Sequence, residues 1–217
     1  MYNEDLALPA YAELFCQSNF SFLSGASHPE ELVRQAAQLS YRAIALTDEC
    51  SVAGVVRAHQ VAKEVGIALI IGSFLRLEEG IEVVLLAADR NGYGNLSELI
   101  TRGRRSARKG EYRLTCADFG EGLEGCLAIW LAGRSSNSWQ GRWLARRFKE
   151  RLWIGLVLSR GPEDVETLIR GKALAQYLRV PMVACGHVLM HTHQRRAVLD
   201  IVYAIRHGCQ VAELGRR

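Results

Sequence analysis

Short apolar segments without regular alternation recur along the chain, and this pattern constrains the fold more than any other feature of the sequence. Four of them read AIAL (43–46), ALIIG (68–72), LAIWLA (127–132) and IGLVL (154–158). A strand with one solvated face would alternate, so these runs are typical of strands buried on both faces, as in a parallel sheet covered by helices. Helical stretches follow most of them, and the sequence therefore predicts an α/β fold.

The alternation of strand and helix favours a β/α barrel. We expect strands at 12–16, 42–46, 67–72, 81–87, 126–132, 152–158 and 181–185. We expect helices at 29–39, 52–65, 94–103, 139–149, 163–178 and 193–206. The first helix has Ser27 and Glu30 at capping-box spacing. A doubly wound open sheet has the same alternation and stays an alternative, although no G-x-G-x-x-G motif follows the first strand.

Composition indicates one soluble domain. The 217 residues are 49% hydrophobic, enough for one buried core, and the formal net charge of +4 is too small to make nucleic-acid binding the default expectation. Six widely spaced cysteines without a C-x-x-C pair predict free thiols of a cytoplasmic protein. The acidic N-terminus does not resemble a secretory leader, and no run of 18 apolar residues occurs.

Few groups that could bind a metal follow the expected strands. In a parallel barrel such groups gather at the carboxyl ends of the strands, where this chain offers Asp48, Glu49 and His187. Asp48 and Glu49 are neighbours on opposite faces of an extended chain, so we expect no carboxylate pair and interpret Asp48 as a structural hydrogen-bond acceptor. His191 and His193 form an H-x-H pair, which is either a metal-ligand motif or part of an ordinary loop and helix start.

Two basic stretches are candidates for phosphate contacts. Residues 102–113 hold six Lys or Arg against one Glu, and 142–151 hold five against one. Trp143, Leu144, Phe148 and the following Leu152 make an apolar stripe, which favours an ordinary amphipathic helix with a solvated face for the second stretch. The candidate phosphate contacts of the first stretch are Arg102, Arg104, Arg105, Arg108 and Lys109.

Four strings carry a family resemblance. They are YAELFCQSNFSFLSGASHPEELV (11–33), LTDECSVAGVVRAH (46–59), GYGNLSELITRGRR (92–105) with KGEYRL after it, and VAELGRR (211–217). In this order and spacing they resemble the N-terminal PHP (polymerase and histidinol phosphatase) domain of the bacterial error-prone polymerase III alpha-like family. The resemblance implies a distorted seven-stranded β/α (TIM-like) barrel, with 1–217 forming a single PHP domain at the start of a much longer polymerase.

The resemblance also implies a degenerate metal site. Active PHP domains hold up to three metals with nine ligands, and none of the matching positions here keeps the family's ligand. Those positions hold Phe15, Gln17, Ser24, Glu49, Phe74, Glu82, Ser159, His187 and Leu189. Aromatic and aliphatic side chains cannot donate to a metal, so we expect no catalytic residue, metal or cofactor in this domain. The polymerase body that follows is expected to use Mg²⁺.

Three functional hypotheses follow. The first is an inactive structural and interaction domain of an error-prone translesion DNA polymerase. Its expected partners are the remainder of the polymerase chain, DNA, the sliding clamp and the accessory proteins of damage-induced mutagenesis, with no membrane. The second is an active metal-dependent phosphoesterase, either a 3′–5′ exonuclease or a pyrophosphatase. The third is a stand-alone β/α barrel enzyme of unrelated chemistry, for which the sequence supplies no mechanism.

Overall fold

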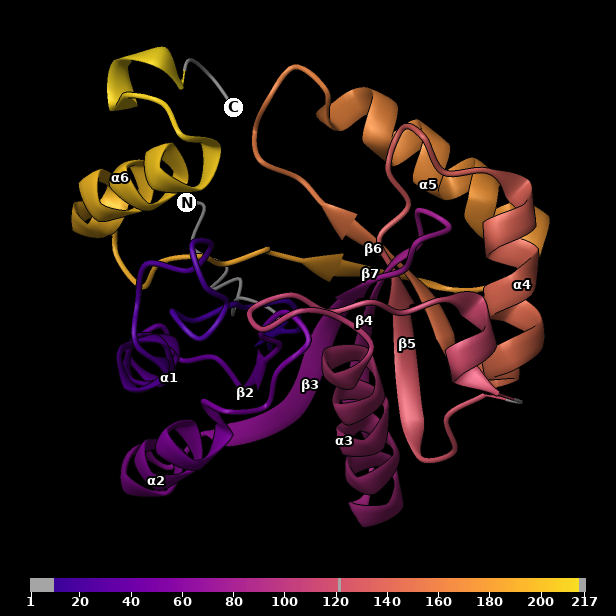
Figure 1. Ribbon diagram of the computed structural model, residues 1–217, viewed down its shortest axis with the longest axis horizontal. Coiled ribbons are helices and arrows are strands. Elements are labelled where there is room, and N and C mark those ends of the chain that lie inside the picture. Colours follow the sequence, from indigo (N-terminus) through magenta and orange to yellow (C-terminus); the bar gives the residue numbers. More distant parts are fainter. Residues whose placement is uncertain (1–9, 121, 215–217) are drawn as a thin grey trace, which may run out of the picture.

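The computed structural model describes residues 10–120 and 122–214, so the first nine residues and the end of the VAELGRR string lie outside the described residues. Seven strands form one sheet in sequence order, with one strand in each expected segment (Figure 1). They are β1 (Ala12–Glu13), β2 (Ala43–Leu46), β3 (Ala68–Arg76), β4 (Glu82–Ala87), β5 (Cys126–Trp130), β6 (Leu152–Val157) and β7 (Met182–Cys185).

The first and last strands meet just beyond their ends. An isolated parallel bridge joins Cys16 to Val188, and the Gln17 backbone N–H donates to the Val188 carbonyl at 2.9 Å. The buried Glu13 carboxylate also accepts a hydrogen bond from the Gly186 backbone N–H at 2.9 Å. These contacts close the sheet into a distorted, nearly closed barrel, which confirms the barrel and removes the open-sheet alternative.

The direction of β4 corrects the expected all-parallel sheet. β4 runs antiparallel to both β3 and β5, while the other four strand pairs are parallel. Only residues 77–81 connect β3 to β4, which is too short for a parallel crossover. Val83 and Val84 are both fully buried, so β4 has the same continuous apolar pattern as its parallel neighbours.

Two strand ends also differ from expectation. β1 contains two residues instead of five, because the chain beyond Glu13 pairs only through the isolated bridge at Cys16. β3 continues to Arg76 instead of ending at Gly72. Ser73 and Phe74 therefore lie inside a strand, and Arg76 stands at its carboxyl end.

Six helices occupy the expected places, and α6 stands apart from the sheet (Figure 1). They are α1 (Pro29–Gln38), α2 (Val55–Val65), α3 (Arg90–Arg105), α4 (Ser138–Phe148), α5 (Asp164–Leu178) and α6 (Arg196–His207). The capping box of α1 lies one residue later than the expected pair of Ser27 and Glu30. His28 is the N-cap, and the Glu31 carboxylate accepts from the His28 backbone N–H at 2.8 Å. Ser27 instead bonds the ring of His191 at 2.7 Å.

Side chains fill the interior of the barrel. One buried cluster combines Phe15, Phe74, Val84 and Ile129, which come from different strands or their ends. Separate clusters lie between the sheet and the helices, the largest around Trp130. Within the described part of the chain, no helix is long and apolar enough to cross a membrane.

Candidate functional site

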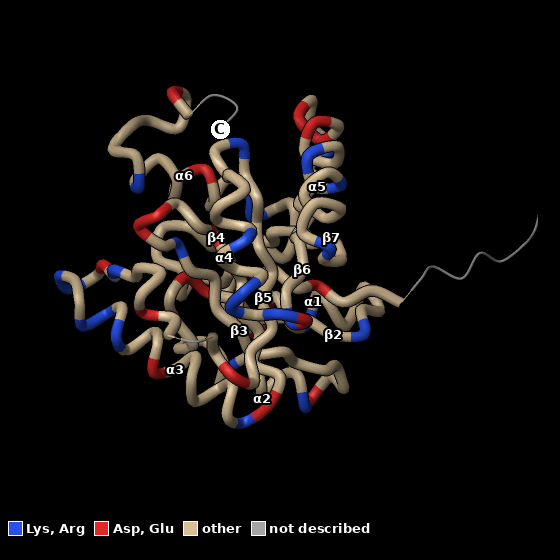
Figure 2. The backbone as a smooth tube through the Cα atoms, turned by 90° about the vertical axis from the view of Figure 1, so that its right-hand side faces the viewer, with Lys and Arg blue, Asp and Glu red and all other residues tan. Residues whose placement is uncertain are grey.

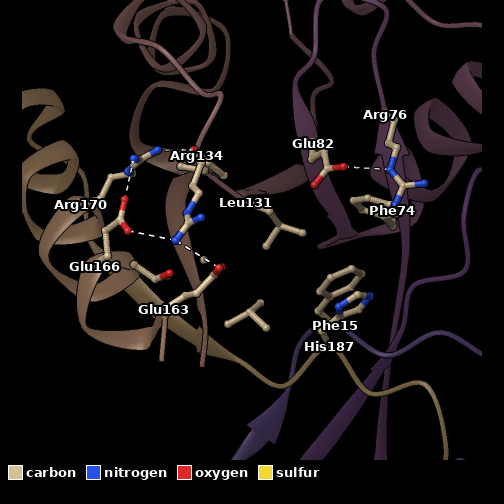
Figure 3. A pocket seen from close by; sticks show the side chains of 15 residues that line it. Phe15, Phe74, Arg76, Glu82, Leu131, Arg134, Glu163, Glu166, Arg170 and His187 are labelled. Carbon is tan, nitrogen blue, oxygen red and sulfur yellow. Dashed lines mark hydrogen bonds and ion pairs between the residues drawn. The ribbon is translucent and has the colours of Figure 1, made fainter. Parts of the chain in front are cut away.

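Three rings form a ring stack where the family's metal site is expected: those of Phe15 and His187 are stacked, and that of Phe74 packs against Phe15 at a tilt of 41°. Phe15 follows β1, Phe74 lies near the end of β3 and His187 follows β7 (Figure 3). The rings of Phe15 and His187 are parallel within 2° with centroids 4.3 Å apart, and the Phe15 and Phe74 centroids are 5.1 Å apart. Both phenylalanines are 2% exposed. Three of the nine expected ligand positions are thus packed against each other.

The imidazole of His187 is held in its neutral form. Burial lowers the pKa of His187 to about 4, and the nearby positive charge of Arg76 adds to this effect. The backbone of His187 has a φ of 49°, in the left-handed region that few non-glycine residues adopt. The closing contacts of the barrel and the ring of Phe15 hold it there.

Arg76 is the charged residue at the centre of this site. Its Nη1 donates to Glu49 Oε1 at 3.0 Å and its Nε donates to Glu82 Oε1 at 2.9 Å. The guanidinium carbon lies 4.9 Å from the centroid of the Phe74 ring. The Tyr112 hydroxyl donates to the same Glu49 oxygen at 3.0 Å. Two further expected ligand positions, Glu49 and Glu82, are therefore joined by an arginine that the sequence analysis did not single out.

The remaining expected positions do not converge with these. Gln17 is buried, and its Nε2 has no hydrogen-bond partner among the described residues. Ser24 accepts a hydrogen bond from Arg206 of α6. Ser159 is exposed beyond the end of β6, and Leu189 contributes its backbone carbonyl to a bond with the Ala26 N–H at 2.8 Å.

A cavity of about 280 Å³ opens beside the ring stack (Figure 3). Three arginines and three glutamates line it, and they are mutually paired. Arg134 binds Glu163 at 3.2 Å and Glu166 at 3.1 Å, and Arg170 binds Glu166 at 3.3 Å. The remaining two, Arg76 and Glu82, form the pair described above. With equal numbers of opposite charges, the cavity offers neither a cluster of free carboxylates nor a free cationic surface.

Asp48 is a structural hydrogen-bond acceptor, as predicted. It is 1% exposed and accepts from the Ser18 backbone N–H at 2.7 Å, the Ser18 hydroxyl at 2.8 Å and the Ser21 hydroxyl at 2.7 Å. Burial raises the pKa of Asp48, and these hydrogen bonds oppose the rise. Asp48 therefore fixes the loop after β1, while its neighbour Glu49 turns towards Arg76.

The H-x-H pair is divided between two environments. The His191 ring bonds Ser27 at 2.7 Å and lies 3.8 Å from the Glu31 carboxylate. His193 is exposed at the start of the short 3₁₀ turn before α6. This arrangement favours the structural interpretation of the pair, because His191 joins the end of the barrel to the start of α1.

The residues present do not fit a bound metal. In residues 10–120 and 122–214, no three His, Cys, Asp or Glu side chains are grouped so that they could hold an ion. Two expected positions, Phe15 and Phe74, carry no donor atom and occupy the volume that an ion and its water ligands would need. The two carboxylates nearest to them are already bound by Arg76.

One candidate phosphate contact of the first basic stretch, Arg104, has its guanidinium bonded to the protein backbone. The half-buried guanidinium of Arg104 donates to the backbone carbonyls of Cys50 and Glu49, each at 3.0 Å, and so holds α3 against the segment that follows β2. Arg102 is exposed and pairs with Glu98. The others lie at the exposed end of α3 and the turn after it (Figure 2). They are Arg105, Arg108 and Lys109.

Family comparison agrees with this fold. The PHP domain model matches residues 13–136, more than half of the chain, and the chain belongs to the PHP domain family. Its sequence is 53% identical to an error-prone DNA polymerase of Pseudomonas aeruginosa over 208 residues, covering 96% of this chain. It is also 53% identical over 206 residues to an error-prone DNA polymerase of Methylococcus capsulatus, covering 94% of this chain. The chain spans about 20% of the length of each of these relatives.

Solved structures share the fold at low sequence identity. A protein assigned as a metal-dependent phosphoesterase from Bifidobacterium adolescentis superposes with a TM-score of 0.62 at 14% identity, covering 85% of this chain and 88% of that one. An amidohydrolase from Chromobacterium violaceum superposes with a TM-score of 0.59 at 13% identity, covering 83% and 88%. At such identities the likeness supports the distorted β/α barrel and carries no information on the chemistry of this chain.

Proposed function

We propose that this chain is the N-terminal PHP domain of an error-prone translesion DNA polymerase, and that it acts there as a structural and interaction module with a degenerate metal site. The stack of Phe15, Phe74 and His187 is the observation that carries this proposal. Burying an aromatic side chain contributes roughly 1.5–3 kcal/mol, so a packed site is favourable without an ion. A hydrolytic site needs the opposite arrangement, with open coordination positions and ligands that hold a metal-bound water.

The charges of the neighbouring cavity support the loss of hydrolysis. A phosphoester substrate brings negative charge, which metal ions or unpaired cations must neutralise in the transition state. Arg134 and Arg170 are engaged by Glu163 and Glu166 instead. Glu82 is likewise engaged by Arg76 and is not free to hold an ion.

The outer face of α6 supports the structural and interaction role. Val198, Ile201 and Ile205 follow each other at helical spacing and are 39%, 51% and 62% exposed. Apart from tethers such as the Arg206–Ser24 bond, α6 packs mainly on its two flanking 3₁₀ turns and not on the barrel. Relatives are about five times longer than this chain, and we propose that the remainder of the polymerase chain covers this apolar face.

The wider proposal follows from the family. The parent protein would be a DNA-directed DNA polymerase that works in the cytoplasm in DNA repair and damage-induced mutagenesis. Its partners would be DNA, the sliding clamp and the accessory proteins of mutagenesis, and its polymerase body would use Mg²⁺. The PHP domain itself would need no cofactor.

Elemental analysis combined with hydrolysis assays tests the proposal. The purified chain is dialysed against chelator-free buffer, analysed for zinc, manganese and iron, and assayed on a phosphodiester and on pyrophosphate with added Mn²⁺ or Zn²⁺. We expect less than about 0.1 metal per chain and no turnover, because a catalytic ion needs about three protein ligands. Phe15→His should also be inactive, since it restores one ligand of nine.

The alternative, an active phosphoesterase, predicts the opposite results. Stoichiometric metal would support it, as would hydrolysis that Glu49→Ala abolishes. Glu150→Ala is the matched control, because Glu150 is exposed and does not line the cavity. Hydrolysis that survives Glu49→Ala would indicate a contaminating enzyme and would leave the inactive-domain proposal in place.

A further inference from the structure

Arg76 extends from the end of β3 into the site. Arg76 follows Phe74 by two residues on β3. Every second residue of a strand points to the same face, so the two side chains lie on the same side of the sheet. The guanidinium carbon of Arg76 lies over the Phe74 ring at 4.9 Å, and Arg76 lines the same cavity as His187. The side chain therefore crosses the ring stack at the place where the family's expected ligands converge.

The guanidinium binds the two carboxylates that remain among those positions. It uses two different nitrogens, Nη1 for Glu49 Oε1 and Nε for Glu82 Oε1, at 3.0 and 2.9 Å. A divalent ion at this place would need the same two carboxylates, so arginine and ion compete for them. A guanidinium keeps its charge at every physiological pH, and unlike a metal ion it cannot dissociate.

The surroundings orient Arg76 and Glu49 towards each other. The Tyr112 hydroxyl accepts from the Arg76 backbone N–H at 3.0 Å and donates to Glu49 Oε1 at 3.0 Å. The side chain of Glu49 is 17% exposed, much less than that of a typical surface ion pair such as Arg113 and Glu78, which are 60% and 52% exposed. Exposed pairs contribute little because water screens them, whereas the largely buried Glu49 has few water contacts to replace a lost partner. Arg76 and Glu82 are each 44% exposed, so Glu49 carries most of the expected effect.

We propose that the guanidinium of Arg76 is the resident cation of this site, taking the place of the metal ion around which the family's site is built. Glu49 and Glu82 are its counter-ions. The inference rests on the proposed loss of the metal site and adds how the site is stabilised. The positive charge that a metal ion would supply is supplied by the guanidinium of Arg76. Together with the ring stack, Arg76 makes the barrel end stable without metal.

Thermal unfolding of a small set of variants of the 217-residue chain tests this inference. Arg76→Met removes the charge and keeps an extended apolar side chain, and it is made in the wild-type chain and in a Glu49→Gln/Glu82→Gln background. The control pair is Arg113→Met in the wild-type chain and in a Glu78→Gln background, because Arg113 binds Glu78 at 2.8 Å on the exposed surface. Each melt is recorded with and without EDTA.

We expect Arg76→Met to lower the Tm by roughly 4–8 °C in the wild-type chain and by less than about 2 °C in the Gln background, where no carboxylate is left unpaired. The control should change the Tm by less than about 2 °C in both backgrounds. Should Arg76→Met alone fail to fold while the triple variant folds, the same coupling is demonstrated.

Two results would overturn the inference alone. One is an equal loss in both backgrounds, which would mean that Arg76 acts by packing on Phe74. The other is a loss no greater than that of the Arg113 control. A fall in the wild-type Tm on adding EDTA would have a wider meaning, because it would show a bound ion and overturn the proposed function as well.

Discussion

Acidification should destabilise this chain through His187. Because burial lowers the pKa of His187 from its ordinary value of 6.5 to about 4, the folded chain keeps the ring neutral over a range in which the unfolded chain takes up a proton. His187 therefore contributes stability fully above about pH 6.5, and this contribution is lost as the pH falls through 4. The difference corresponds to roughly 3 kcal/mol in total, and to about 2 kcal/mol between pH 7.5 and pH 5.

Urea unfolding at pH 7.5, 6 and 5 measures this effect. His187→Gln cannot ionise in this range, so the free energy of unfolding of the variant should fall by about 2 kcal/mol less than that of the wild type between pH 7.5 and 5. The comparison cancels other groups, including Asp48, whose raised pKa acts in the opposite sense by favouring the folded state as the pH falls. His59→Gln is the control, because His59 is exposed on α2.

The role of His187 would be refuted if the wild type and His187→Gln had the same pH dependence of the free energy of unfolding within about 0.5 kcal/mol. It would also be wrong if His59→Gln had the same effect as His187→Gln, because exposure would then make no difference. If Arg76→Met in an otherwise wild-type chain removed the pH dependence that is assigned to His187, the lowered pKa of His187 would be due mainly to the charge of Arg76 and not to burial.

Three further predictions concern packing and charge. Phe15→Ala should lower the free energy of unfolding by about 3–5 kcal/mol in urea titrations, and a cost below about 1 kcal/mol would contradict the packed ring stack. Gly92→Ala should lower the Tm, because its Cβ would meet the Gly125 carbonyl oxygen at 2.0 Å, whereas Gly94→Ala, which has open space, should not. Binding of DNA to the chain should be weak. If three cations of 102–109 contact phosphates, the binding constant should fall by roughly 40-fold when the salt concentration rises from about 50 to about 200 mM. Tight, salt-insensitive binding in a titration would refute this prediction.

The sequence was sufficient for the number of strands and helices but not for the direction of every strand. Burial on both faces produces a continuous apolar run whether a strand is parallel or antiparallel, as β4 demonstrates. The length of the connection was the available signal, because five residues between β3 and β4 cannot form a crossover. Barrel closure depended on contacts between residues far apart in the sequence, which no local pattern encodes. One is the hydrogen bond from the Gly186 backbone N–H to the Glu13 carboxylate, 173 positions away.

The aromatic half of the site could be predicted, and the charged half could not. Phe15 and Phe74 were found by comparison with the family's ligand positions, and their packing is as the side chains suggest. Arg76 lay within reach of the same reasoning, since it follows Phe74 by two residues on a strand, but the strand was expected to end at Gly72. The pairing of Arg134 with Glu163 joins the loop after β5 to the start of α5, and periodicity does not reveal which charges meet there.

The replacements at this site depend on one another, which explains why no single reversion should restore a metal. Phe15→His would place a polar ring in a buried apolar position while Arg76 still held both carboxylates. Removing Arg76 alone would free the carboxylates beside two phenylalanine rings that leave no volume for an ion and its water. Each change is unfavourable until the others are made, so the packed and the metal-binding arrangements are separated by several simultaneous substitutions.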